Sequence, residues 1–388
     1  MSLPAYPITY QPETSPSWLN YTAALSGAAT CDLKRPFRYL ELGCGRGYSA
    51  LLHSAAHPGG DFHAVDRDTG AIAAARAWAD ACGVRNVTFH AAPFAQTALE
   101  GRFDFIVLHG VYSWVDAAAR ARVRVLLRDL LAPGGLGYVS YNCLPGWAGE
   151  LPLRRLLNEF SMGGDADAAA RELERLRACG FAYFKAHPSA ERAVRSWAGR
   201  PEGYLAQEYL ADACEVLWAV DVMDEMAAVG LTWIASATPR DHHEALLVDE
   251  EASRAIAGLG TARLRTLALD FAVNRSFRRD VFVRGEPVRD SVALGAVKIR
   301  LCGDAIPLSI VMPRGRIHFG ADFIAALQKI MAGGAIGLDQ AVAALGEPRA
   351  ARNILWLIAG GALAPAMPDE KAFMGLQARL SRIGIAPS

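Results

Sequence analysis

FRYLELGCGRGYSALLHSAA, residues 37–56, carries the clearest structural signal in this chain. Residues 37–43 form a short, mostly apolar run typical of a buried strand, and the segment after residue 47 has the pattern of a helix. Three glycines separate the two segments, at positions 43, 45 and 47. A glycine-rich turn from a strand into a helix presents backbone N–H groups and the positive helix end to a ligand. This turn is therefore the first candidate binding site.

Strand and helix patterns alternate on the C-terminal side of this turn. The apolar runs predict further strands at 62–66, 86–92, 104–109 and 136–141. Between them, residues 69–82 and 117–131 predict helices, and the second of these ends at a Pro-Gly-Gly stop. Such alternation at short spacing is typical of an α/β fold with a doubly wound, parallel, Rossmann-like sheet.

The pattern changes after residue 147. Helical periodicity dominates residues 151–229, followed by one expected strand at 231–237. From about residue 300, a short strand pair precedes three helices, predicted at 321–332, 338–345 and 348–359, which suggests a winged-helix-like unit. We therefore expect three domains: 1–150 with the sheet, 151–290 mainly helical, and 291–388 winged-helix-like.

Composition excludes several classes of protein. The chain has 388 residues, 52% of them hydrophobic and 21% charged, so disordered, collagen-like and coiled-coil structures are excluded. The longest apolar run is too short to span a bilayer, and the first ten residues lack the pattern of a secretory signal. The seven cysteines show no metal-ligand spacing. We expect a cytoplasmic protein without a membrane segment or a structural metal.

Charge is unevenly distributed along the chain. Lys plus Arg and Asp plus Glu total 40 each, yet residues 151–260 hold 11 basic and 18 acidic residues, and 261–388 hold 17 basic and 10 acidic. These segments are thus net −7 and net +7. They either attract each other or form solvated faces, or else the acidic segment draws a basic substrate toward a site.

The residues around the glycine turn restrict the ligand. Tyr48 stands where a dinucleotide-binding loop has its third glycine, and no GKS or GKT sequence is present, so dinucleotides and triphosphates are disfavoured. A carboxylate at Glu41 suits a cationic ligand, and Asp66, at the end of the second strand, can accept both ribose hydroxyls. S-adenosylmethionine combines these features, and the pattern favours a class I methyltransferase.

Several longer motifs support this interpretation: ELGCGRG (41–47), FDFIVLHGVYSWV (103–115) and SYNCLPGW (140–147). With them, the chain resembles the bacterial class I methyltransferases that carry a methyltransferase regulatory domain, a group that includes bacterial protein-lysine methyltransferases. The likeness continues through YLAQEYL (204–210), VMDEMAAVGLTWIASA (222–237) and DFAVNRSFRRDVFV (270–283). It therefore covers roughly residues 1–285.

The expected cofactor contacts lie at the ends of the first four strands. They are Glu41, Gly43, Cys44, Gly45, Gly47, Asp66, Arg67, Phe94 and His109. The third strand ends in Ala-Ala-Pro-Phe (91–94), where such folds often place an acid toward the adenine amine. Backbone groups or Phe94 are expected to replace that acid.

The catalytic candidates follow strands four and five or lie in the acidic segment. They are His109, Tyr112, Tyr141, Asn142, Glu208 and Tyr209. His109 is either a general base or a packed residue that holds its loop. Tyr112 and Trp114 either wall the acceptor slot or belong to the core. Glu208 and Tyr209 are expected to close over the acceptor, unless they simply lie on a helix surface.

The acceptor stays open at this level. The resemblance favours a protein lysine, while a small molecule or a modified peptide from a biosynthetic pathway is the first alternative. A regulatory module that binds S-adenosylmethionine without turnover is the second. Nucleic acid is disfavoured, and a homodimer is left open.

Overall fold

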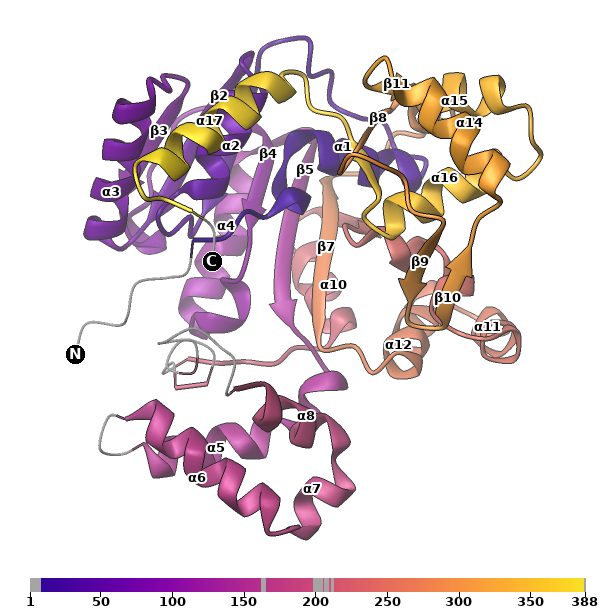
Figure 1. Ribbon diagram of the computed structural model, residues 1–388. Coiled ribbons are helices and arrows are strands. Elements are labelled where there is room, and N and C mark those ends of the chain that lie inside the picture. Colours follow the sequence, from indigo (N-terminus) through magenta and orange to yellow (C-terminus); the bar gives the residue numbers. More distant parts are fainter. Residues whose placement is uncertain (1–7, 162–164, 198–204, 206–208, 211–212, 387–388) are drawn as a thin grey trace.

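The structure is a computed structural model, shown in Figure 1. It describes residues 8–386, apart from 162–164, 198–204, 206–208 and 211–212. Glu208, a predicted catalytic residue, lies outside the described residues. Among those that are described, no helix is both long and apolar enough to cross a lipid bilayer.

A seven-stranded sheet forms the centre of the molecule, in the order β3-β2-β1-β4-β5-β7-β6. Its strands are β1 (Phe37–Leu42), β2 (Gly60–Asp66), β3 (Val87–Ala91), β4 (Phe103–Leu108), β5 (Leu131–Asn142), β6 (Leu231–Ser236) and β7 (Phe277–Arg284). The first five are parallel, while β7 runs antiparallel to both β5 and β6. The expected Rossmann-like sheet is confirmed.

Alternating side chains of the sheet meet helices on both faces. In β1, Leu40 and Leu42 belong to the cluster under α4 (Ala117–Leu130) and α10 (Ala219–Ala227), whereas Phe37 and Tyr39 belong to the cluster under α1 (Pro16–Leu25). This is the period of two that a strand buried on both faces requires. The covering helices are α1 (Pro16–Leu25), α2 (Tyr48–Ala56), α3 (Thr69–Cys82), α4 (Ala117–Leu130) and α10 (Ala219–Ala227).

A helical unit follows β5 and lies at the carboxyl end of that strand (Figure 1). It contains α5 (Leu151–Phe160), α6 (Ala166–Ala178), α7 (Ala182–Ala186) and α8 (Pro188–Trp197). These helices share their own core, which includes Leu157, Leu173 and Trp197. The helices expected in this region are present. The strands β6 and β7, however, return to the central sheet, so the sheet extends beyond the expected boundary at residue 150.

The C-terminal unit has the expected strand pair and three helices. They are β9 (Ser309–Met312), β10 (Gly315–His318), α14 (Ala321–Met331), α15 (Leu338–Leu345) and α16 (Ala350–Ala359). A small second sheet joins β8 (Lys298–Leu301), β11 (Ile336–Gly337) and β12 (Leu363–Pro365). Its winged-helix character stays a prediction.

The last helix, α17 (Glu370–Arg382), leaves the C-terminal unit and crosses back to α2 (Figure 1). Along the chain, α11 (Glu250–Ala257) and α12 (Ala262–Ala272) lie between β6 and β7, and α13 (Ala293–Ala296) lies between β7 and β8. The sequence patterns did not predict α17.

Candidate active site

The glycine loop between β1 and α2 needs its three glycines for different reasons. Gly43, Gly45 and Gly47 all have positive φ angles, of 76°, 54° and 68°. A Cβ atom at Gly43 would lie 2.4 Å from Val111 Cγ2, and one at Gly47 would lie 2.3 Å from Phe89 Cε1. No atom of the described residues lies within 4 Å of a Cβ built at Gly45. Gly43 and Gly47 therefore allow close packing, whereas Gly45 borders open space.

This open space is a cavity of about 450 Å³ at the carboxyl ends of β1, β2 and β4, where a doubly wound sheet binds its ligand. It brings together eight of the nine residues expected to contact the cofactor: Glu41, Gly43, Cys44, Gly45, Asp66, Arg67, Phe94 and His109. Gly47 shapes the loop without lining the cavity. Trp114 and the N-terminal residues Ile8, Thr9 and Gln11 also line it. No pattern in the sequence pointed to the N-terminal residues.

Glu41 is a buried carboxyl group at the cavity. Its side chain is only 6% exposed, and its Oε2 atom has no hydrogen-bond partner among the described residues. Burial, and then repulsion from Asp66, raises the pKa of Glu41 to about 8. A buried acceptor without a partner costs free energy, and a cationic or hydroxyl group of a ligand would remove that cost.

Asp66, at the end of β2, ties the glycine loop in place. Its Oδ2 accepts a hydrogen bond from Gly45 N (2.8 Å), and its Oδ1 accepts one from Asp68 N (2.9 Å). Each carboxylate oxygen can accept a further bond. Fixed in this way at the cavity wall, the two oxygens fit a pair of neighbouring hydroxyl groups such as those of a ribose.

Phe94 lies on the short 3-10 turn η2 (Phe94–Gln96) after β3. Its carbonyl oxygen accepts a hydrogen bond from Arg122 Nε (3.1 Å), and Thr97 O accepts one from Arg122 Nη2 (3.0 Å). Arg122 belongs to α4, so this turn is held from the neighbouring helix. The half-buried Phe94 ring lines the cavity and fits the flat face of an adenine base.

His109 lines the cavity just beyond the end of β4. Its Nδ1 lies 2.8 Å from the hydroxyl oxygen of Tyr138. Burial, and then the nearby charge of Arg279, lowers the pKa of His109 to about 3. The imidazole is therefore neutral at physiological pH and too weak a base to take a proton from an alkyl ammonium group.

Tyr112 and Tyr141 do not reach this cavity. Tyr112 is fully buried and donates a hydrogen bond to Glu225 Oε2 on α10 (2.6 Å). Tyr141 is 1% exposed and donates to Asp280 Oδ2 on β7 (2.5 Å). Both phenol groups therefore connect elements of the fold, and neither lines the cavity as expected for an acceptor wall.

Through Asp280, Tyr141 joins a buried network of ion pairs that connects β7 with α12 and with the 3-10 turn η5 (Pro239–His242). Arg278 pairs with Asp270 and Asp280 (2.8 Å each), and Arg275 pairs with Asp270 (2.8 Å) and Asp241 (2.9 Å). Burial acts to raise the pKa of Asp280, but Arg278 and the hydrogen bonds to this carboxylate outweigh it and lower the pKa. Each charge is compensated within the network, as burial requires.

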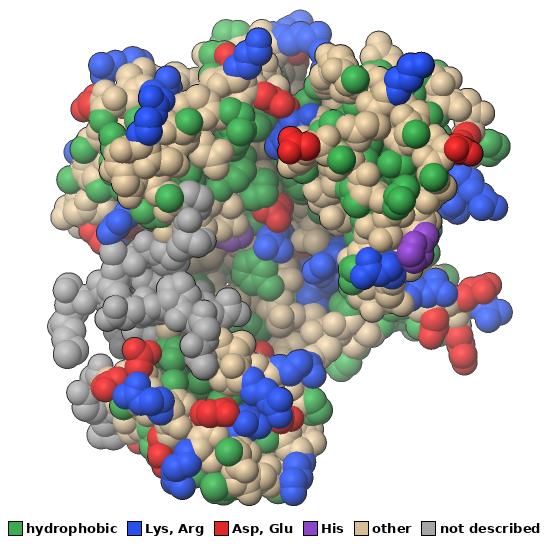
Figure 2. Space-filling model, in the orientation of Figure 1, with side chains coloured by type: hydrophobic (Ala, Val, Ile, Leu, Met, Phe, Trp, Pro, Cys, Tyr) green, Lys and Arg blue, Asp and Glu red, His purple; other side chains and the backbone are tan. Residues whose placement is uncertain are grey.

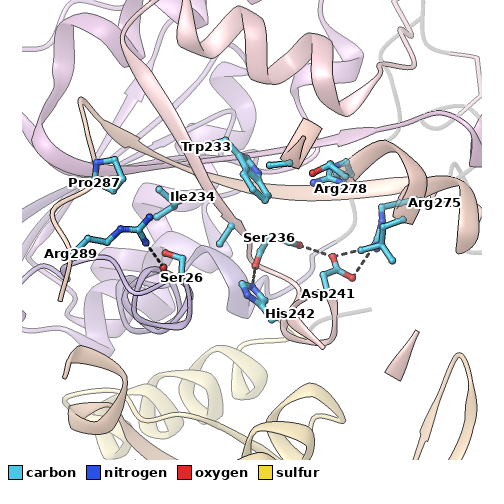
Figure 3. Close-up of a pocket in the computed structure, with 14 residues that line it drawn as sticks. Ser26, Trp233, Ile234, Ser236, Asp241, His242, Arg275, Arg278, Pro287 and Arg289 are labelled. Carbon is cyan, nitrogen blue, oxygen red and sulfur yellow. Dashed lines mark hydrogen bonds and ion pairs between the residues drawn. The ribbon is translucent and has the colours of Figure 1, made fainter. Parts of the chain in front are cut away.

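A second cavity, also of about 450 Å³, lies beside this network (Figure 3). Trp233, Asp241 and Arg275 are among its lining residues, and Arg289 lies at the opposite end from Arg275. None of the predicted site residues that the structure describes lines this cavity.

Asn142 ends β5 next to Tyr141. Its backbone N–H donates to Ser113 Oγ (2.9 Å), which joins β5 to η3 (Tyr112–Trp114). The side-chain Nδ2 is buried and has no hydrogen-bond partner among the described residues. Asn142 is thus a predicted catalytic residue whose buried amide N–H group has no partner among the described residues, although it does not line the cavity.

Tyr209 lies in the core of the helical unit. Its hydroxyl donates to Glu150 Oε2 (2.8 Å), and its ring contacts Trp147 and Trp197 at centroid distances of 5.7 and 5.0 Å. Trp147 in turn meets Trp114 edge to face at 6.5 Å. Because Trp114 lines the cavity, this row of aromatic rings connects the cavity wall with the helical unit.

Many acidic groups of residues 151–260 are paired within the helical unit. Arg175 contacts Glu172 (2.5 Å), Arg177 contacts Glu174 (2.6 Å) and Arg195 contacts Glu191 (2.7 Å). In Figure 2, basic and acidic side chains are interspersed over the visible face of this unit. This arrangement favours a mixed surface over a uniformly acidic one.

Two family models match this chain. Residues 40–135, which contain the glycine loop and Asp66, match a model described as "Methyltransferase domain". Residues 201–284 match a model described as "Predicted methyltransferase regulatory domain". The chain thus combines a class I S-adenosylmethionine-dependent methyltransferase domain with a methyltransferase regulatory domain. The predicted family is thereby confirmed, with S-adenosylmethionine as its methyl donor. The placement of this cofactor in the cavity stays a prediction.

The relatives of this methyltransferase differ in how much of it they share. An uncharacterized protein of Synechocystis is 29% identical over 327 residues, which cover 81% of this chain and 64% of that protein. The malonyl-[acyl-carrier protein] O-methyltransferase of Bacillus cereus is 35% identical over 104 residues, 27% of this chain and 37% of that enzyme. The chain thus spans less than two thirds of the length of these curated relatives.

A solved structure shares the fold over nearly the whole chain. PKMT2 from Rickettsia typhi in complex with AdoHcy superposes with a TM-score of 0.74 at 21% identity, over 93% of this chain and 77% of PKMT2. At that identity, the match establishes the fold. The match extends beyond the central sheet, because the superposed 93% of this chain is more than the methyltransferase domain alone.

Proposed function

We propose that this chain transfers the methyl group of S-adenosylmethionine to the side-chain amine of a protein lysine. The assignment of the methyl donor rests on the buried carboxyl group of Glu41. This group has an oxygen without a hydrogen-bond partner among the described residues, and it lies beside the Asp66 carboxylate in one cavity. The family supplies the reaction class. The name of the structural neighbour PKMT2 and the motifs shared with bacterial protein-lysine methyltransferases support the acceptor.

The bound cofactor supplies an activated methyl group on a sulfonium centre. The residues of the chain hold the donor: Glu41 faces its cationic part, Asp66 binds the ribose, and Phe94 packs against the base. His109 stays neutral and offers one hydrogen bond at the cavity wall. Because it does not ionise near pH 7, its role is to position a group rather than to take the proton of the amine.

The acceptor is expected to approach along Trp114, which lines the cavity and is backed by the buried rings of Trp147 and Tyr209. Aromatic faces attract alkylammonium groups and methylated amines by about 0.5–2 kcal/mol. They also exclude water from the path of the amine, which a methyl transfer requires. The acceptor site in this proposal lies between the sheet and the helical unit, with Asn142 nearby as an amide that can orient the amine.

A small-molecule acceptor is the second candidate. The Bacillus cereus relative, which is named for O-methylation of a malonyl group on acyl-carrier protein, favours it over the shared 104 residues. A binding module without turnover is the third. Incubation with isotope-labelled S-adenosylmethionine and a cell extract, followed by size fractionation, separates the three.

Label in proteins that tandem mass spectrometry places on lysine side chains supports the proposal. Label in the low-mass fraction, or on a carboxyl group carried by a protein and not on lysine, contradicts the lysine acceptor and supports the small-molecule candidate. Tight donor binding without label in either fraction contradicts turnover and supports the binding module.

A further inference from the structure

The N-terminal strap, residues 8–11, covers one side of the donor cavity. Ile8, Thr9 and Gln11 line this cavity, whereas Tyr10 packs away from it. The strap is fixed to α2 by two polar contacts of Ser49, whose Oγ accepts from Gln11 N (3.0 Å) and donates to Thr9 O (3.4 Å).

Tyr10 is held between two rings from different parts of the chain. Its ring centroid lies 5.4 Å from that of His53 on α2 and 5.2 Å from that of Phe373 on α17. Both contacts are edge to face, with interplanar angles of 61° and 62°. This is a favourable geometry for aromatic pairs, and it joins residues that are 363 positions apart in sequence (373 − 10).

The helix α17 is firmly docked where it makes this contact. Phe373, Leu376 and Leu380 are buried in one cluster with Leu51 and Leu52 of α2. Asp369 N donates to Ala56 O (2.9 Å), and Arg300 pairs with Glu370 (3.2 Å). In Figure 1, α17 lies along α2 above the sheet. The helix therefore offers the strap a rigid support.

Tyr48 gives α17 a second connection to the donor site. It is the first residue of α2, directly after the glycine loop, and it both lines the cavity and belongs to the cluster under α17. The C-terminal helix thus packs behind two walls of the cavity, the strap and the start of α2.

We propose that α17 completes the donor site and that Phe373 is a positioning residue, which holds Tyr10 so that the strap covers the bound donor. This inference rests on the assignment of the cavity to S-adenosylmethionine. It goes beyond that assignment because it gives the last helix of the chain a role in donor affinity. Phe373 does not line the cavity, so it acts through Tyr10.

The test measures the binding of S-adenosylhomocysteine to the full chain by isothermal titration, which requires no turnover. Phe373→Ala and Tyr10→Ala should each weaken binding about fivefold or more. Because they remove the same contact, the double variant should bind about as weakly as either single one. Phe373→Tyr keeps the ring and should restore affinity to within about twofold of the unchanged protein.

Leu380→Ala is the matched control. Leu380 is fully buried in the same cluster, two helical turns after Phe373, so its truncation loosens α17 without removing the ring contact. It should lower the melting temperature as Phe373→Ala does but leave affinity within about twofold. Tyr10→Ala keeps the test valid if Phe373→Ala fails to fold, because it leaves α17 unchanged.

Hydrogen exchange in the absence of any ligand gives a second readout. The amide of Gln11 should exchange faster in Phe373→Ala than in Leu380→Ala. Equal affinity of Tyr10→Ala and the unchanged protein would overturn the inference, as would an equal loss in Leu380→Ala. If the unchanged protein does not bind S-adenosylhomocysteine, the donor assignment itself fails, while a changed exchange rate at Gln11 would still support the contact.

Discussion

Gly45 and Asp66 are joined by a hydrogen bond of 2.8 Å from the Gly45 amide to Asp66 Oδ2. This bond links the loop after β1 to the end of β2 and orients the Asp66 carboxylate at the donor cavity. Gly45, which borders the open space, and Asp66, which we propose accepts the ribose hydroxyl groups, therefore support each other. Substitutions in this pair should affect binding more than they affect the fold.

Alanine substitutions at two of the loop glycines, Gly45 and Gly47, should have different effects. Gly47→Ala places a methyl group 2.3 Å from the Phe89 ring at a positive φ of 68°, so it should lower the melting temperature strongly. Gly45→Ala meets no neighbour within 4 Å, so its fold should lose only about 1 kcal/mol from backbone strain. Its donor affinity should nevertheless fall about tenfold. Thermal unfolding and titration of both variants check this, and equal stability losses would contradict it.

Glu41 should make stability depend on pH. Its pKa is raised from 4.5 to about 8, so the folded protein without ligand holds a proton that the unfolded chain releases between these values. The stability that Glu41 contributes is therefore present below pH 4.5 and is lost as the pH rises to 8. Glu41→Gln should flatten this decline in melting temperature between pH 5 and pH 8. Parallel curves for the two proteins would show that Glu41 does not titrate in this window.

Tyr141→Phe should reduce stability rather than donor binding. The substitution removes the hydroxyl group that donates to Asp280 inside the buried network, which costs about 1–3 kcal/mol when the acceptor is charged. Donor affinity should stay within about twofold, since Tyr141 does not line the cavity. Chemical denaturation and titration of the same preparation check both values. A large loss of affinity at unchanged stability would place Tyr141 in the site after all.

His109→Ala should lower kcat about tenfold without changing the shape of the pH profile. The pKa of His109 is about 3, so the imidazole does not ionise between pH 5 and pH 9. A positioning group of this kind changes the rate equally across that range. The profile of kcat/KM for both proteins is the measurement. A break near neutrality that disappears in the variant would identify His109 as a general base.

The donor site could be predicted from the sequence because its residues lie in short local motifs. Glu41, the glycines and Asp66 each follow a strand whose apolar pattern is clear, and parallel strands bring their carboxyl ends to one edge. The strap could not be predicted in this way. Its contacts with the cavity and with Phe373 depend on tertiary packing, and residues 8–11 carry no periodic pattern.

The pairing of β7 in the sheet, and with it the arrangement near the proposed acceptor site, could not be predicted from the sequence. Residues 275–284 contain five charged side chains, which is atypical of a buried strand, yet Arg278 and Asp280 are buried as partners in the sheet. The direction of the Tyr141 phenol could not be predicted without this strand, because Asp280 is its hydrogen-bond acceptor. Pairing between segments that are distant in sequence determines these positions, and the local sequence pattern carries no information about that pairing.

The most direct test of the donor assignment is isothermal titration of S-adenosylhomocysteine into the full chain and into Asp66→Asn. The variant keeps the size of the side chain but replaces one acceptor oxygen with a donor, and Asp80→Asn on the exposed face of α3 is the control. We expect a dissociation constant in the micromolar range for the unchanged protein and the control, and a loss of about tenfold or more for Asp66→Asn. Absence of binding to the unchanged protein, or equal affinity in all three, would contradict the account.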